Sequence, residues 1–251
     1  MGFGLEFGHQ FPEGRDMSEP RVLAPQLLTD SQQLIVCYEA EDKAALKSLV
    51  PEGFEALEPG YAFINQYWVP NADQLSNAKH PQGWGAYSLT YLGMEVAGYD
   101  LYDGTATRWW THYYNSSPAM TEYAAVRGIP TTPGGRTELE IGKTEIVATT
   151  YLDNKPIIRT QARYSDKVSP PISGQLQYLT RQDGEYEVGR YPFVGVAQQD
   201  FELVSLQFLD PASSVYQLRP KQPFNVKTAL FTPKLTVCYP GGQQKLDEAP
   251  F

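Results

Sequence analysis

Residues 105–114 read Thr-Ala-Thr-Arg-Trp-Trp-Thr-His-Tyr-Tyr. Successive side chains of a β-strand point to opposite faces, so an unbroken strand would place Arg108, Trp110 and His112 on one face and Trp109 on the other. Neither face is purely apolar, which is expected where a barrel interior holds polar groups or a ligand. The alternative is a solvent-exposed face rich in Thr, Tyr and Arg, which is common on antiparallel sheets.

The same alternation recurs along the chain. We predict ten strands, at residues 34–38, 61–69, 87–96, 105–114, 138–152, 157–164, 175–180, 201–209, 215–218 and 224–238. Two short helices are expected, one at 41–50 that ends before Pro51 and one that begins at Ser117-Pro118 and ends at Gly128. Many short strands with turn residues between them predict a mainly β fold, a large antiparallel or mixed barrel or sandwich.

The composition sets limits on function. The 251 residues include 20 Lys+Arg and 29 Asp+Glu, which gives a net charge of −9. Nucleic acids and anionic membranes need a basic protein face, so neither is an expected partner. With 41% hydrophobic residues the chain can bury a core, and we expect one domain over 1–251 with an N-terminal arm at 1–20.

The sequence indicates neither a cofactor nor a metal. His9, His80 and His112 are too far apart for a metal-binding motif, and no nucleotide-binding glycine pattern occurs. Cys37 and Cys238 are expected to be buried free thiols in a reducing compartment. No secretory signal or membrane-spanning stretch is visible, so we expect a cytoplasmic protein.

Three stretches resemble the acetoacetate decarboxylase superfamily. They are the segment 34–38 followed by 42–55, the segment 113–120 and the segment 145–150. The resemblance implies a large β-barrel with a few helices outside it, a site in the interior, a small-molecule substrate and a homo-oligomer.

The catalytic lysine of that family is missing. Family decarboxylases form an imine through a lysine whose basicity a neighbouring lysine lowers. In the family this pair follows a proline; counting from Pro118 reaches Pro130, and the next residues are Thr131 and Thr132. A threonine hydroxyl cannot form an imine. The resemblance therefore implies a member without the Schiff-base lysine.

We expect catalysis to depend on three residues. Arg108, with Arg159 or Arg163, would hold a carboxylate or enolate, because guanidinium binds carboxylates through two parallel hydrogen bonds. His112 or Glu95 would transfer protons. The alternatives are that the arginines pair with glutamates of neighbouring strands, that Glu95 faces water at a strand end and that His112 is an ordinary half-buried side chain.

The expected substrate-binding residues are hydroxyl donors and aromatic walls. The donors are Tyr67, Tyr91, Thr131 and Thr132, and the walls are Trp68, Trp109 and Trp110. These assignments assume unbroken alternation, which a single β-bulge would reverse.

The predicted function is a lyase or cyclase for a small oxo acid or polyketide-like substrate. It would use non-covalent acid/base chemistry for dehydration, aldol-type cyclisation or decarboxylation. One alternative is a small-molecule-binding protein without catalysis. Another is a decarboxylase with a displaced lysine. Lys143 falls in a predicted strand or its turn and Lys155 in a predicted hairpin turn, and a solvated, protonated turn lysine is a poor nucleophile.

Overall fold

The computed structural model describes residues 26–74, 83–101, 103–240 and 243–246. The predicted N-terminal arm at 1–20 lies outside these residues. No helix in the described ranges is long and apolar enough to span a membrane.

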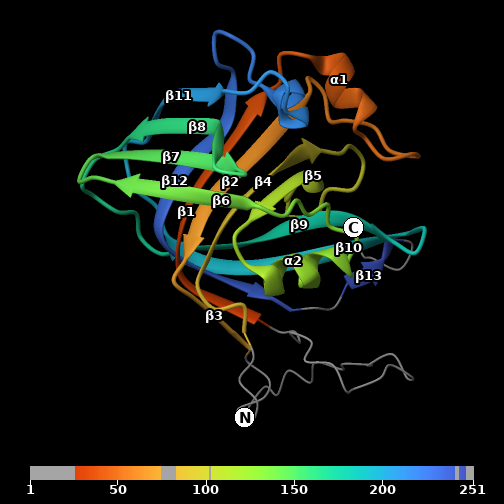
Figure 1. Cartoon of the computed structure of the whole chain (residues 1–251), viewed down its shortest axis with the longest axis horizontal. Helices are drawn as coiled ribbons and strands as arrows, with labels where there is room; N and C mark the ends of the chain where they lie inside the picture. The colour runs from red at the N-terminus through yellow and green to blue at the C-terminus, as the bar shows by residue number, and fades with distance from the viewer. Residues whose placement is uncertain (1–25, 75–82, 102, 241–242, 247–251) are drawn as a thin grey trace.

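Seven strands close into a mixed barrel (Figure 1). In spatial order they are β12 (Val226–Tyr239), β1 (Gln26–Glu39), β2 (Tyr61–Val69), β4 (Tyr87–Glu95), β5 (Thr107–Asn115), β9 (Ile172–Gln182) and β10 (Glu185–Val196). Pairing of β10 with β12 closes the ring, and β5 and β9 form its parallel pair. Two short strands extend it, β3 (Asn71–Gln74) beside β1 and β13 (Gln243–Lys245) beside β10. The predicted mainly β barrel is confirmed.

A second sheet packs against the outside of β1, β2 and β4. Its strands run in the order β11 (Glu202–Phe208), β8 (Lys155–Arg163), β7 (Glu145–Leu152) and β6 (Gly135–Ile141), and Figure 1 shows them stacked on one side of the barrel. Buried polar groups join the sheets: Gln66 Nε2 donates to Thr150 Oγ1 at 2.9 Å, and Thr90 Oγ1 lies 2.6 Å from the same oxygen. Buried polar atoms need such partners.

Both predicted helices are present. In α1 (Lys43–Ser48) the Asp42 side chain accepts the amide of Ala45 at 2.9 Å, and in α2 (Pro118–Ala125) Ser117 caps the first turn in the same way. The strand predicted at 215–218 is wrong: Ser214–Leu218 is a 3₁₀ helix, η1. Val215 and Leu218 are both buried, so the apolar period there is three rather than two.

Two strand predictions need correction. The strand predicted over 138–152 is the hairpin of β6 and β7, because the chain turns at Gly142, whose amide donates to Glu145 O at 2.8 Å. The closing strand β10 was not predicted, since it contains Gly189, Pro192 and Gly195, residues that are uncommon in strands.

Aromatic side chains fill the barrel interior. The buried core there includes Phe63, Tyr67, Tyr87, Tyr91, Trp110, Tyr113, Tyr178, Tyr191 and Tyr239. The rings of Trp110 and Tyr178 stack with centroids 4.1 Å apart. A cavity of about 10 Å³ remains beside Gln33, Tyr67 and Tyr91, which is about the space that one water molecule needs.

Gly93 permits a close approach of β4 and β5. A Cβ atom at this position would lie 1.8 Å from the carbonyl oxygen of Trp109. We expect Gly93→Ala to lower the free energy of unfolding by about 1–3 kcal/mol, because backbone atoms cannot move aside cheaply. Urea denaturation measures the change. The control is Gly142→Ala, where the closest atom is the flexible Glu145 Cγ at 3.2 Å; equal losses in both variants would contradict the prediction.

Candidate active site

A β-bulge in β5 decides which side chains enter the barrel. Leu92 pairs with His112 and Gly93 pairs with Trp110, so Thr111 is an extra residue without a partner in β4. The bulge reverses the alternation. Arg108 and Trp110 therefore face the interior, where the Arg108 guanidinium lies 5.3 Å from the centre of the Phe63 ring. His112 faces outward, so the prediction that it shares a face with Arg108 and Trp110 is wrong.

A charged group lies where β4 ends and β5 begins. The Glu95 carboxylate is 2% exposed, and its Oε2 accepts a hydrogen bond from Lys227 Nζ at 2.5 Å. Arg108 Nη2 lies 3.9 Å from the other oxygen, Oε1. The Cys37 thiol donates to the same oxygen at 3.6 Å, and burial, with the Glu95 charge, raises the pKa of Cys37 to about 12. Glu95 is thus a buried, paired carboxylate and does not face water at the strand end.

Hydrogen-bonded side chains continue from this charged group into the barrel. Arg108 pairs with Tyr178 across β5 and β9 and contacts its hydroxyl. The hydroxyls of Tyr178 and Tyr91 are 2.7 Å apart. Asn65 Nδ2 donates to Tyr91 at 2.8 Å and to Gln33 Oε1 at 3.1 Å. Burial raises the pKa values of both tyrosines, although the Arg108 charge opposes the rise for Tyr178. Both hydroxyls are therefore protonated at neutral pH.

Several interior polar atoms have no hydrogen-bond partner among the described residues. They include Asn65 Oδ1, Arg108 Nε and Trp110 Nε1, and the hydroxyls of Tyr87 and Tyr113. Buried polar atoms without a partner are uncommon because each costs about 1–3 kcal/mol. These buried atoms are unpaired, so a small polar ligand that entered the interior would find both donors and an acceptor there.

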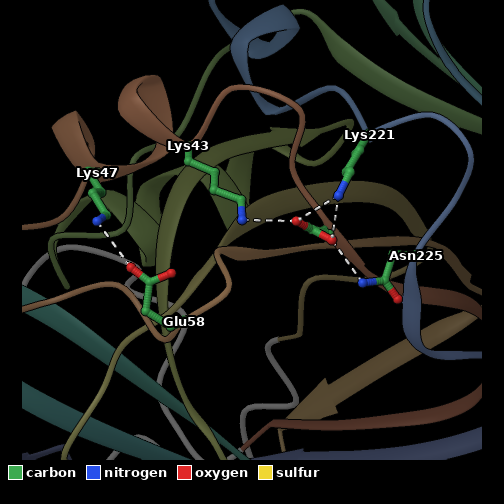
Figure 2. A network of polar contacts seen from close by, with 6 residues as sticks. Lys43, Lys47, Glu58, Lys221 and Asn225 are labelled. Atoms are coloured by element: carbon green, nitrogen blue, oxygen red, sulfur yellow. Dashed lines mark hydrogen bonds and ion pairs between the residues drawn. The ribbon is translucent and has the colours of Figure 1, made fainter.

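A second carboxylate lies on the same rim of the barrel. Glu39 is bound by Lys43 at 3.0 Å, by Lys221 at 3.3 Å and by Asn225 Nδ2 at 2.8 Å. Figure 2 shows Lys43, Lys221 and Asn225 converging on one carboxylate, with the separate pair Lys47–Glu58 nearby. Hydrogen bonds from Asn225 and Lys43 lower the pKa of Glu39 to about 2, so it remains charged above mildly acidic pH.

Tyr61 lies beside both carboxylate groups. It pairs with Glu39 across β1 and β2, and Lys227 Nζ, which binds Glu95, lies 5.0 Å from the centre of its ring. Together the two groups contain four cations, Lys43, Lys221, Lys227 and Arg108, and two carboxylates. This rim cluster is net positive in a chain whose total charge is −9. It therefore favours anions locally.

The structure separates several of the predicted binding residues. Tyr67, Tyr91 and Trp110 lie in the interior, as expected. Trp68 is 39% exposed on the outside of β2. Trp109 packs against the apolar cluster outside the barrel, and the centroids of the Trp109 and Tyr186 rings are 6.4 Å apart. These two tryptophans do not line the interior because they alternate with side chains that do.

The remaining predicted residues lie outside the barrel. Arg159 and Arg163 are exposed on β8 of the second sheet, so the prediction that one of them holds a carboxylate together with Arg108 is wrong. Arg163 instead lies opposite Glu145 in the register of β7 and β8. Thr131 and Thr132 are half-buried after α2, where the Thr132 amide donates to Tyr113 O at 2.9 Å.

Sequence reasoning missed Lys227, Gln33, Asn65 and Tyr178. Each stands in a segment predicted as a strand or beside one, but only the barrel register brings the four toward Glu95 and Tyr91. Lys143 lies in the turn between β6 and β7 and is 81% exposed, whereas Lys155 is 63% exposed as the first residue of β8. Cys37 and Cys238 are free, and only Cys37 is fully buried. The described residues include no cluster of His, Cys, Asp and Glu that could hold a metal.

Comparison with known proteins identifies the fold. No family profile matches the sequence, and no curated protein does. A solved acetoacetate decarboxylase superposes with a TM-score of 0.64 and 15% identity over 92% of this chain and 95% of that chain. The acetoacetate decarboxylase of Legionella pneumophila gives 0.63 and 15% over 96% and 94%. The enduracididine biosynthesis enzyme MppR, complexed with pyruvate, gives 0.58 and 10% over 92% and 93%. The chain thus has an acetoacetate decarboxylase-like fold.

Proposed function

We propose that this chain is an enzyme that acts on a small oxo acid by non-covalent acid/base chemistry, as a lyase or cyclase. The proposal rests on one observation, the buried Glu95 carboxylate. Lys227 binds it and Arg108 lies close to it, and the hydrogen-bonded hydroxyls of Tyr178 and Tyr91 continue from this group into the barrel. A buried carboxylate with specific charged partners is a candidate functional group. MppR, which shares the fold, has been solved with the oxo acid pyruvate.

The residues divide the chemistry between them. Arg108 Nε and the Lys227 ammonium would bind the substrate carboxylate, and the Tyr178 hydroxyl would donate to the substrate carbonyl. When a carbon–carbon or carbon–oxygen bond breaks, its electrons move toward that carbonyl oxygen as an enolate. One donor aimed at such an oxyanion is worth about 3–4 kcal/mol. Glu95 would exchange the proton at the adjacent carbon.

An imine is not part of this proposal. The hydroxyls of Thr131 and Thr132 cannot condense with a ketone, and the side chains of Lys143 and Lys155 are exposed to solvent outside the barrel. Lys227 is the amine that contacts Glu95, where it forms an ion pair with the carboxylate. The alternative of a decarboxylase with a displaced lysine would have to use this group.

The small interior cavity supports a second candidate function. About 10 Å³ holds one water and no oxo acid, so a substrate would bind at the rim, where the side chains of Arg108 and Lys227 are 16% and 36% exposed, or would displace aromatic rings. A protein that binds a small acid without turnover would need only the rim. Turnover and binding must therefore be measured separately.

We expect acetoacetate or pyruvate to raise the melting temperature of the protein, because a ligand selective for the native state stabilises it. Arg108→Gln should weaken binding roughly 10- to 100-fold, the effect of losing a charged hydrogen bond of about 1.5–3 kcal/mol. Thermal shift against ligand concentration gives the dissociation constants. Arg159→Gln, at an exposed position of β8, is the matched control. Equal weakening by both substitutions would contradict the assigned site.

We expect Glu95→Gln to reduce turnover of the oxo acid by at least about 100-fold while binding is retained, because the amide cannot exchange a proton. Product formation is followed by proton NMR. Glu140→Gln, which changes an exposed glutamate on β6, serves as the control. If the unaltered protein binds the acid but forms no product, the binding function replaces the enzymatic one.

Borohydride reduction distinguishes the covalent alternative. Treatment in the presence of acetoacetate should leave Lys227, Lys143 and Lys155 unmodified, because the proposed chemistry forms no imine. Peptide mass spectrometry detects a reduced adduct directly. A secondary amine on Lys227 would overturn the non-covalent mechanism and identify the displaced lysine.

A further inference from the structure

A hydrogen-bonded Ser–His–Thr group lies outside the barrel. Ser214, the first residue of η1, is exposed, and its Oγ is 3.0 Å from His112 Nε2. His112 Nδ1 is 2.9 Å from Thr111 Oγ1. The Thr111 hydroxyl in turn donates to Leu92 O at 3.3 Å. Because the bulge turns His112 away from the interior, this group is separate from Glu95 and Arg108.

The hydrogen bonds fix the positions of the protons. The Thr111 hydroxyl has one proton and gives it to Leu92 O, so its oxygen accepts from an N–H at Nδ1 of His112. Burial lowers the pKa of His112 to about 4, so the ring is neutral at pH 7 and Nε2 carries no proton. Nε2 therefore accepts the hydroxyl proton of Ser214. This tautomer is the one that a serine–histidine catalytic pair requires.

We propose that Ser214 is a nucleophile and His112 its general base, in a second reactive site that accepts acyl groups from activated carboxylic esters. Thr111 is a positioning residue that orients the imidazole, the role that a carboxylate has in many such groups. The exposure of Ser214 allows an acyl donor to reach it without entering the barrel.

Tyr114 supplies a hydrogen-bond donor beside the serine. Burial raises its pKa to about 12, so the phenol is protonated at neutral pH, and its hydroxyl interacts with those of Ser213 and Ser214. Its ring lies against the His112 ring, with centroids 6.1 Å apart. A neutral donor next to the nucleophile is suited to stabilise the oxyanion of a tetrahedral intermediate.

The reaction needs only the ester and water. Ser214 Oγ bonds to the acyl carbon while Nε2 takes the hydroxyl proton. The tetrahedral oxyanion collapses, the bond to the leaving oxygen breaks, and the leaving group receives the proton from Nε2. Water then gives a proton to Nε2 and attacks the acyl-serine, which releases a carboxylic acid and returns the proton to Ser214.

The test uses p-nitrophenyl acetate with the full-length protein. We expect a burst of about one p-nitrophenolate per chain and an acetyl group on Ser214 by peptide mass spectrometry, since acylation precedes a slower hydrolysis. Ser214→Ala should abolish the burst. Ser173→Ala is the control, because Ser173 is an exposed serine on β9 that lies outside this group, and it should retain the burst. Acetylation elsewhere, or an equal burst in both variants, would overturn the proposal.

Substitutions of the buried partners test the relay. His112→Gln should slow acylation by at least about 100-fold, as expected for loss of a general base.

Thr111→Val should slow acylation and shift the pH at which its rate is half-maximal, whereas Thr111→Ser should restore both. A fall in rate without a shift of the pH profile would assign Thr111 a purely structural role. Since Ser214 and Ser173 are both exposed, their comparison decides the proposal even if the His112 variant does not fold. Arg108→Gln should leave the burst intact, so the two proposed sites can fail independently.

Discussion

The close contact of β4 and β5 at Gly93 determines which residues of β5 face the barrel interior. No side chain separates Gly93 from the Trp109 carbonyl, and the unpaired Thr111 lies two residues after Trp109 in β5. An extra residue in one strand bends it and turns the following side chains to the other face. Arg108 therefore enters the barrel while His112 leaves it. Both proposed sites depend on this bulge.

The charged group at the barrel end is not explained by stability. Taking a carboxylate and an ammonium out of water costs several kcal/mol per ion, and replacing such a pair with apolar groups is often neutral or favourable. Glu95 and Lys227 are nevertheless placed next to Arg108 and a thiol kept protonated by burial. Asn65 and Trp110, which lie near this charged group, also have polar atoms without hydrogen-bond partners. Such an arrangement is easier to account for as a binding site than as a core.

Much of the fold could be predicted from local patterns, and much of the site could not. Alternation located β2 correctly at residues 61–69. Apolar spacing before Pro51 located α1, and the Ser117-Pro118 cap located α2. Prediction failed where a strand contains Gly and Pro, as in β10, or where apolar spacing is three, as in η1. The ion-pair partner of Glu95 is Lys227, which is distant in the sequence, and only closure of the barrel brings the two side chains together. The predicted homo-oligomer and cytoplasmic location stay predictions.

The two proposed sites differ in the charge that they can stabilise. The rim cluster has more cations than carboxylates, so it suits a substrate that arrives as an anion and reacts through an enolate. The pair His112–Ser214 has no carboxylate behind it, because Thr111 offers only a neutral oxygen. An imidazolium formed there during acyl transfer gains little electrostatic support, and burial opposes it further. That limits the outer site to acyl donors with good leaving groups, which need little help from the base. A single strand thus presents chemistry for anions on its inner side and for neutral esters on its outer side.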